Sequence, residues 1–165
     1  MGFSEASMLS KVGLGLAAAA LLFDIIGFAT VYWIAGSTAI PFVGSVDAHL
    51  GLFKSCTAGL CASFGSAELD WQTATKALVI LGFLLGLGSL ALIIVYLFLK
   101  TDQMLFKTIA FVLAFAAAGF TIIGIIVFAA KATELSPTLN LSWSFGLTII
   151  GGLLYGATGI VLVIG

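Results

Sequence analysis

The chain has 165 residues, of which 62% are hydrophobic and 8% are charged, and its formal net charge is −1. A water-soluble domain is about half apolar and about a quarter charged, and so short a chain has too little interior to hide this much apolar surface. The composition therefore excludes a disordered chain and an ordinary soluble enzyme. The six lysines form no basic run, which excludes a nucleic-acid partner, and the single histidine argues against a haem or multi-histidine zinc cofactor.

Four stretches are apolar over the roughly 20 residues that a membrane-spanning helix needs. They cover residues 8–33, 71–99, 104–130 and 141–165, with loops at 34–70, 100–103 and 131–140 between them. The first stretch begins like a signal peptide, but its apolar run continues past Asp24 to Trp33, which favours a retained anchor. The sequence therefore predicts a single all-α integral membrane domain over residues 1–165, built as a bundle of four transmembrane helices.

The orientation in the membrane is almost tied by positive charge, because three lysines fall on each predicted side. Charges count mainly near span ends in short loops, and Lys54 is far from both ends of its loop, which slightly favours cytoplasmic termini. Cys56 and Cys61 both lie in the 34–70 loop, and a close pair in an exposed loop is stable as a disulfide only in an oxidising compartment. We therefore expect a Cys56–Cys61 disulfide, both loops 34–70 and 131–140 outside, and both termini in the cytoplasm.

Tryptophan and lysine positions agree with this orientation. Trp33, Trp71 and Trp143 fall at ends of spans on the predicted outer side. Because amphipathic rings favour the headgroup layer, we expect all three tryptophans at that interface. Lys76 lies about one turn into the second span, where its long side chain can snorkel outward to the headgroups.

Small residues recur at helical spacing on each predicted span, which allows helices to approach closely in lipid. The four stripes comprise Gly13, Ala17, Ala20 and Gly27; Thr75, Gly82, Gly86 and Ser89; Ala110, Ala114, Ala117, Thr121 and Gly124; and Thr148, Gly152, Gly156 and Gly159. Together these stripes predict that all four helices form one bundle.

Asp24 is the one ionisable residue deep in a predicted span, and it lies on the first stripe. An intramembrane carboxyl is a functional candidate by default, but a proton or cation path would be expected to contain several such groups. We therefore expect a neutral Asp24 that hydrogen-bonds to a neighbouring helix. Thr121 is the predicted partner, because Asp24 and Thr121 each lie about 13 Å from the outer end of their span at the helical rise.

The 34–70 loop and its flanks carry a recognisable motif, which consists of Trp33, Gly51-Leu52-Phe53, Cys56, Cys61 and, at the start of the second span, Lys76. This motif resembles the signature of the claudin superfamily, which includes claudins, peripheral myelin and epithelial membrane proteins, the lens-fibre membrane protein and stargazin-type receptor subunits. Phe53 stands where the family has a second tryptophan, and Lys76 stands where it usually has arginine. The short gap between the cysteines and the segment 141–145 look most like the lens-fibre and epithelial branch.

The resemblance implies a small antiparallel β-sheet, formed by the first extracellular loop and resting on the bundle. The loop itself agrees, because residues 37–46 and 49–56 contain β-compatible runs interrupted at Pro41 and Gly44. Gly59 suits a tight turn between the two cysteines.

We expect no catalytic or metal-binding role for the other features of the loops. Gly51-Leu52-Phe53 either anchors the sheet at the lipid surface or contacts a partner, and His49 beside it is expected in solvent. The sequon at Asn140 lies so near the membrane that we expect it to remain unglycosylated. The chain ends at Gly165, so we expect no PDZ-binding tail of the kind that claudins have.

No residue constellation predicts catalysis, so we expect a non-enzymatic protein without a small-molecule substrate. The resemblance implies a plasma-membrane protein at cell–cell contacts, where it acts in adhesion or paracellular barrier formation by lateral and trans self-assembly as a homo-oligomer. Two alternatives remain open. One is an auxiliary subunit that docks on a channel, receptor or larger membrane complex, and the other is a proton or ion conductor that uses Asp24.

Overall fold

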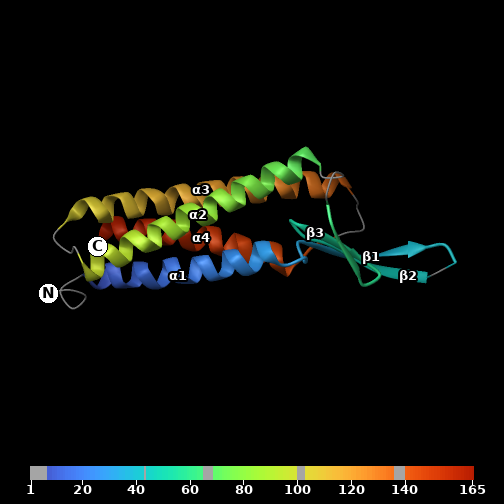
Figure 1. Cartoon of the computed structure of the whole chain (residues 1–165), viewed down its shortest axis with the longest axis horizontal. Helices are drawn as coiled ribbons and strands as arrows, with labels where there is room; N and C mark the ends of the chain where they lie inside the picture. The colour runs from blue at the N-terminus through green and yellow to red at the C-terminus, as the bar shows by residue number, and fades with distance from the viewer. Residues whose placement is uncertain (1–6, 43, 65–68, 100–102, 136–139) are drawn as a thin grey trace.

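The computed structural model describes residues 7–42, 44–64, 69–99, 103–135 and 140–165. Its helices are α1 (Met8–Ala29), α2 (Asp70–Phe98), α3 (Met104–Leu135) and α4 (Trp143–Ile164). All four are long and apolar enough to cross a membrane, and they run side by side as a bundle (Figure 1). The predicted four-helix membrane bundle is confirmed, while residues 43, 65–68, 100–102 and 136–139 of the predicted loops lie outside the described residues.

Two helix ends differ from the predicted span ends by four or five residues. The first span is predicted to reach residue 33, but α1 ends at Ala29 because Thr30 is extended, with φ −93° and ψ 157°. The Thr30 hydroxyl donates to the Ile26 carbonyl oxygen at 2.8 Å, which satisfies an acceptor in the last turn of the helix. In contrast, α3 is longer than predicted, because it continues to Leu135 and the predicted span ends at residue 130.

Glycines set the distance between neighbouring helices. A methyl group on Gly27 of α1 would lie 2.9 Å from the amide nitrogen of Thr148 in α4. A methyl group on Gly82 of α2 would lie 3.1 Å from the carbonyl oxygen of Ala117 in α3. Because both distances are too short for a relaxed carbon contact, the two helix pairs can approach this closely only with glycine at these positions. α1 packs mainly on α4, α2 packs mainly on α3, and α3 also packs on α4.

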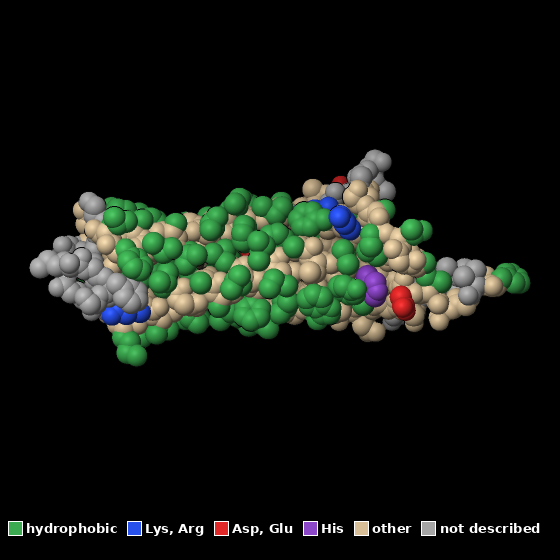
Figure 2. Space-filling view, turned by 60° about the horizontal axis from the view of Figure 1, so that its bottom comes forward, with side chains coloured by type: hydrophobic (Ala, Val, Ile, Leu, Met, Phe, Trp, Pro, Cys, Tyr) green, Lys and Arg blue, Asp and Glu red, His purple; other side chains and the backbone are tan. Residues whose placement is uncertain are grey.

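The outward faces of the helices are apolar. Leu22, Ile123 and Leu153 are 62%, 51% and 60% exposed, and hydrophobic side chains run along the whole bundle in Figure 2, where the visible lysines lie near its two ends. In water a surface of this size would drive aggregation. The chain is therefore a multi-pass membrane protein, and this surface contacts the lipid bilayer.

A small antiparallel sheet forms from the segment between α1 and α2 together with one strand before α4. Its strands are β1 (Ile34–Ile40), β2 (Gly44–Leu50), β3 (Lys54–Thr57), β4 (Leu60–Ser63) and β5 (Asn140–Leu141). Their order across the sheet is β4-β3-β2-β1-β5, and every neighbouring pair is antiparallel. The predicted small antiparallel sheet is confirmed.

The sheet lies at one end of the bundle, and the β1–β2 hairpin points away from the helices (Figure 1). α1 begins and α4 ends at the opposite end. We call these two ends the sheet end and the terminal end. Among the described residues the two ends therefore differ, because the sheet end carries strands beyond its helices.

Candidate functional site

A buried aromatic core fixes the sheet to the bundle. Trp33 is fully buried, and its ring centroid lies 4.7 Å from that of Phe128 in α3 and 5.6 Å from that of Phe145 in α4. Its indole Nε1–H donates to the Gly27 carbonyl oxygen at 2.8 Å. The sequence predicts only the level of Trp33 in the membrane. The structure adds that its ring is enclosed by protein, because the extended chain after α1 carries it between α3 and α4, where a backbone carbonyl accepts its hydrogen bond.

The segment Gly51-Leu52-Phe53 joins β2 to β3 and has two faces. A methyl group on Gly51 would lie 2.6 Å from the Cα of Val31, so the sheet rests directly on the chain that leaves α1. Leu52 is 2% exposed and packs in the Trp33 core. Phe53 is 37% exposed. Gly51 and Leu52 therefore anchor the sheet to the bundle, while Phe53 stays at the surface.

Lys76 lies next to Phe53 at the sheet end of α2. Its Nζ is 5.4 Å from the centroid of the Phe53 ring and 5.3 Å from that of Phe64. Both distances are within the range of cation–π attraction. The sequence predicts only a snorkelling lysine, whereas the structure brings together two members of the motif that are far apart in the chain.

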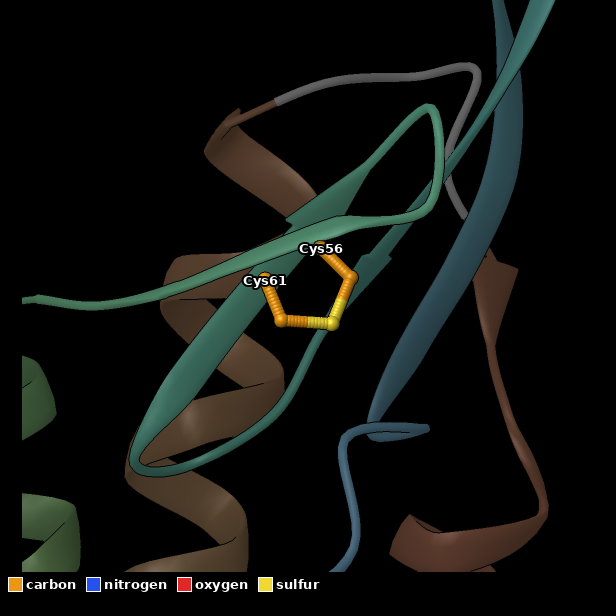
Figure 3. The surroundings of a disulfide bond; sticks show 2 residues. All are labelled: Cys56 and Cys61. Atoms are coloured by element: carbon orange, nitrogen blue, oxygen red, sulfur yellow. A yellow bond between two sulfur atoms is a disulfide. The ribbon is translucent and has the colours of Figure 1, made fainter.

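The β3–β4 hairpin is closed by a disulfide between Cys56 and Cys61, which face each other in the antiparallel register (Figure 3). The turn residues Ala58 and Gly59 have φ of 53° and 79°, which is the left-handed pair that a two-residue type I′ turn requires. The predicted disulfide and the predicted glycine turn are both confirmed.

Apolar side chains occupy the hairpin turns of the sheet. Phe42, in the β1–β2 turn, is fully exposed, and Leu60, beside the β3–β4 turn, is 82% exposed. Phe42 also has φ of 71°, a backbone conformation that a bulky residue rarely adopts. Neither burial nor backbone preference accounts for a phenylalanine at this place, and backbone outliers of this kind cluster at functional sites. The sequence analysis did not single out Phe42, although a Pro-Phe pair at a predicted break between strands is a detectable signal.

Three rings form a cluster where the sheet meets α4. Tyr32 stacks on Trp143 with centroids 5.5 Å apart, and His49 of β2 lies 4.6 Å from the Tyr32 ring on centroid distance. The prediction that His49 is solvated is wrong in part, because its Nδ1 is buried and has no hydrogen-bond partner among the described residues. Within that part of the chain no group of three or more potential metal ligands occurs.

Asp24 lies fully buried in the middle of the bundle. The Tyr155 hydroxyl of α4 donates to its Oδ2 at 3.2 Å. The Tyr155 ring lies across Gly86 of α2, where an added methyl group would be 2.7 Å from the hydroxyl oxygen. One tyrosine therefore joins α1, α2 and α4 at this depth, and the arrangement is that of an interhelical hydrogen bond between polar side chains.

The predicted Asp24–Thr121 hydrogen bond is wrong. The Thr121 hydroxyl faces Gly82, and neither it nor Asp24 Oδ1 has a hydrogen-bond partner among the described residues. The Thr121 methyl group points toward α4, 3.3 Å from where a methyl on Gly152 would lie. The helical rise placed the two residues at one depth, but it did not give the direction of each side chain around its helix axis.

Sequence reasoning also missed Tyr155 itself. This residue lies seven positions after Thr148 and four before Gly159, so it falls on the small-residue stripe of the fourth span. A single tyrosine on such a stripe, with a carboxyl on the stripe of another span, is the signal that would have found the pair. Two further bonds between elements were missed. One joins the hydroxyl oxygens of Thr30 and Ser144 at 2.6 Å, and in the other the Ser89 hydroxyl donates to the Ala110 carbonyl oxygen at 2.7 Å.

Comparison with models of known protein families and with curated protein sequences gives no match to this chain. The functional argument therefore depends on the features described above. These are an anchored, disulfide-closed sheet with exposed apolar turns at one end of a membrane bundle, and a buried Asp24–Tyr155 pair inside it.

Proposed function

We propose that the chain is a claudin-like, non-enzymatic protein of the plasma membrane that joins neighbouring cells by self-assembly. Lateral contacts between copies and trans contacts between opposing sheets together build an adhesive or barrier-forming contact. The observation that carries this proposal is Phe42, which is fully exposed in the hairpin turn that points away from the bundle. Aromatic residues, phenylalanine among them, are enriched at the cores of protein–protein interfaces.

The layout of the chain supports the claudin-like part of the proposal. Four apolar helices, a sheet between the first two, and a disulfide hairpin occur in the order that the resemblance implies. Three motif residues, Trp33, Gly51 and Leu52, meet at the junction of sheet and bundle. In this proposal they hold the sheet at a fixed angle, and the turns beyond them make the contacts.

The proposal places the sheet end outside the cell and the terminal end in the cytoplasm. It is supported by the Cys56–Cys61 disulfide, which is stable in an oxidising compartment. An epitope tag inserted after Ser63 should be stained by antibody on intact cells, whereas a tag at either terminus should be stained only after permeabilisation. Staining of a terminal tag on intact cells would show that the orientation is reversed.

The adhesion test uses non-adherent cells in two colours, each expressing the full chain with a cytoplasmic fluorescent tag. We expect the protein to concentrate where two expressing cells touch. Phe42→Ser should weaken the contact roughly thirtyfold and lower that enrichment accordingly, because loss of an aromatic anchor typically costs about 2 kcal/mol of binding free energy. Phe42→Trp keeps a large apolar ring at the same place and should retain the enrichment.

Two controls make the result decisive. Surface biotinylation shows whether the Ser and Trp variants reach the plasma membrane equally, and mixing expressing with non-expressing cells shows whether the contact needs the chain on both sides. A diffuse membrane signal together with co-purification of a larger membrane complex would reject self-assembly in favour of an auxiliary subunit. Equal enrichment of the Ser variant and the unchanged chain would reject the sheet turn as the contact.

A further inference from the structure

One row of side chains crosses the sheet on a single face. His49 of β2 lies directly opposite Cys56 of β3, and Cys56 lies directly opposite Cys61 of β4. Directly opposite residues of antiparallel strands point to the same face, with their Cβ atoms about 5 Å apart. The sheet therefore places the single histidine of the chain next to the disulfide.

The two cysteines of the disulfide differ in accessibility. Cys56 is 4% exposed, whereas Cys61 is exposed, as are the other three residues of the edge strand β4. A thiolate opens a disulfide by attacking one sulfur while the other sulfur leaves, and access helps to decide which sulfur is attacked. An external thiol therefore meets Cys61 first, and Cys56 carries the sulfur that leaves.

The surroundings of Cys56 suit a leaving thiolate. His49 Nδ1 is buried and has no hydrogen-bond partner among the described residues, and leaving a buried polar group without a partner costs free energy. A thiolate at Cys56 would be an anionic acceptor for this nitrogen on the same face of the sheet. Protonated histidine is one of the neighbours that stabilise a cysteine thiolate, so His49 favours departure of the Cys56 sulfur.

Three other titratable side chains lie near this row, namely Tyr32, Asp47 and Lys54. The centroid of the Tyr32 ring is 4.6 Å from that of the His49 ring. Asp47 and Lys54 are exposed and lie two residues before His49 and Cys56 on their strands, so they share the face of the row. β1, β4 and β5 carry no charged residue. Positive charge near the disulfide can therefore come from His49 or from Lys54, and a variant of each separates the two.

We propose that Cys56, Cys61 and His49 form a thiol–disulfide exchange site for small extracellular thiols of the glutathione class. The thiol loses its proton to water, and its sulfur bonds to Cys61 Sγ as the bond between the two cysteines breaks. The electron pair of that bond leaves on Cys56 Sγ, and protonated His49 donates its Nδ1 proton to the thiolate. A second thiol then bonds to the first one, which releases Cys61 as a thiol and leaves one oxidised pair of external thiols.

Exchange at this site opens one hairpin and leaves the rest of the sheet in place. In the described part of the sheet, β4 pairs with β3 alone, whereas β1 and β2 pair over seven residues and rest on the Trp33 core. The inference rests on the proposed function only because that function places the sheet end outside the cell. Its test uses the isolated chain, so failure of the exchange and failure of cell–cell adhesion are separate results.

The first experiment asks which sulfur is attacked. The purified full chain in detergent is treated with excess reduced glutathione, quenched with N-ethylmaleimide and analysed by fragmentation mass spectrometry. We expect glutathione on Cys61 together with N-ethylmaleimide on Cys56, about tenfold above the reverse arrangement, because access favours the exposed sulfur. Equal amounts of the two adducts, or a disulfide that stays intact in excess glutathione, would overturn the proposal.

The second experiment tests His49. His49→Phe keeps a ring against Tyr32 but removes both nitrogens, and it should slow opening of the disulfide about tenfold through loss of a hydrogen bond to a charged group. Lys54→Gln is the matched control, because it removes an exposed positive charge from the same face, and it should change the rate less than about twofold. Equal slowing by the two variants would contradict a specific role for His49.

A pH profile separates proton donation from packing. In a Cys61→Ser chain, the alkylation rate of Cys56 is measured against pH, and the midpoint should rise by about one unit when His49→Phe is added. A midpoint that does not move would show that His49 only packs beside the disulfide. If the Cys61→Ser chain fails to fold, the glutathione adducts and opening rates of the disulfide-bonded chains still decide the proposal.

Discussion

The bundle and the sheet differ in what holds each of them in place. Fully buried residues recur along α1 and α4, whereas all four residues of β4 are exposed and β3 has one buried residue, Cys56. In the bundle, close backbone approach at glycines supplies the contacts. In the sheet, antiparallel pairing, one disulfide and the Trp33 core do so. A change in the bundle should therefore alter the global stability, whereas a change in the sheet should stay local.

The largest expected effect tests the glycine contacts of the bundle. Gly27→Ala places a methyl group 2.9 Å from the Thr148 amide nitrogen, and a backbone atom cannot move aside without shifting α4. We expect a loss of about 3 kcal/mol of stability, at the upper end for overpacked sites, measured as a lower midpoint of thermal unfolding in detergent.

Gly15→Ala, in the same helix, is the matched control for that change. A methyl group at Gly15 meets nothing within 4 Å, so the substitution should be neutral or stabilising by up to about 1 kcal/mol through helix propensity. If both variants melt at the same temperature, the bundle does not depend on the α1–α4 approach at Gly27.

The second effect is smaller and should remain in the sheet. Cys56→Ser together with Cys61→Ser removes a bond whose short loop contributes about 2 kcal/mol by chain entropy. We expect faster hydrogen exchange and proteolysis across β3 and β4, with the helical circular dichroism unchanged. Without reductant, alkylating reagents should label neither cysteine of the unchanged chain, and ready labelling of both in intact cells would contradict the disulfide.

The smallest effect concerns the Asp24–Tyr155 pair. Interhelical hydrogen bonds in membranes average about 0.6 kcal/mol and reach about 1.7, so Tyr155→Phe should lower the unfolding midpoint only slightly. Asp24→Asn keeps a donor and an acceptor and should be equally mild. Asp24→Leu should cost more, because α4 passes close to this position at Gly151. The space is so small that a methyl group built on Gly151 would lie 3.2 Å from the Asp24 Cβ, so a branched leucine side chain would press on α4.

A functional readout separates this structural role from ion conduction. If Asp24→Asn abolished a measurable proton or cation current while the unfolding midpoint stayed unchanged, Asp24 would be a conducting group and the structural interpretation would fail. Under the structural interpretation, the Asp24→Asn variant and the unchanged chain give the same background current in vesicles, and the Asp24→Leu variant shows the larger loss of stability.

Local sequence determined the parts of this protein that depend on length, composition and near neighbours. Four apolar stretches long enough for the bilayer predicted α1 to α4, because in lipid the backbone must satisfy its own hydrogen bonds. The spacing of Cys56, Gly59 and Cys61 predicted the closed hairpin, because a two-residue turn brings those cysteines opposite one another. The stripe that carries Asp24 predicted correctly that it faces the interior.

Only the tertiary structure decided which groups meet across the chain. Asp24 and Thr121 were expected to pair from depth alone, yet Tyr155 takes the hydrogen bond, because the rotation of each helix about its axis follows from packing against several neighbours at once. Nothing in the sequence indicated that the Trp33 ring is enclosed by protein, since the route of the chain from α1 into β1 is set by what the sheet rests on. Helical rise and hydropathy can be calculated from one segment alone. The direction of a side chain in a bundle depends on how all four helices pack together.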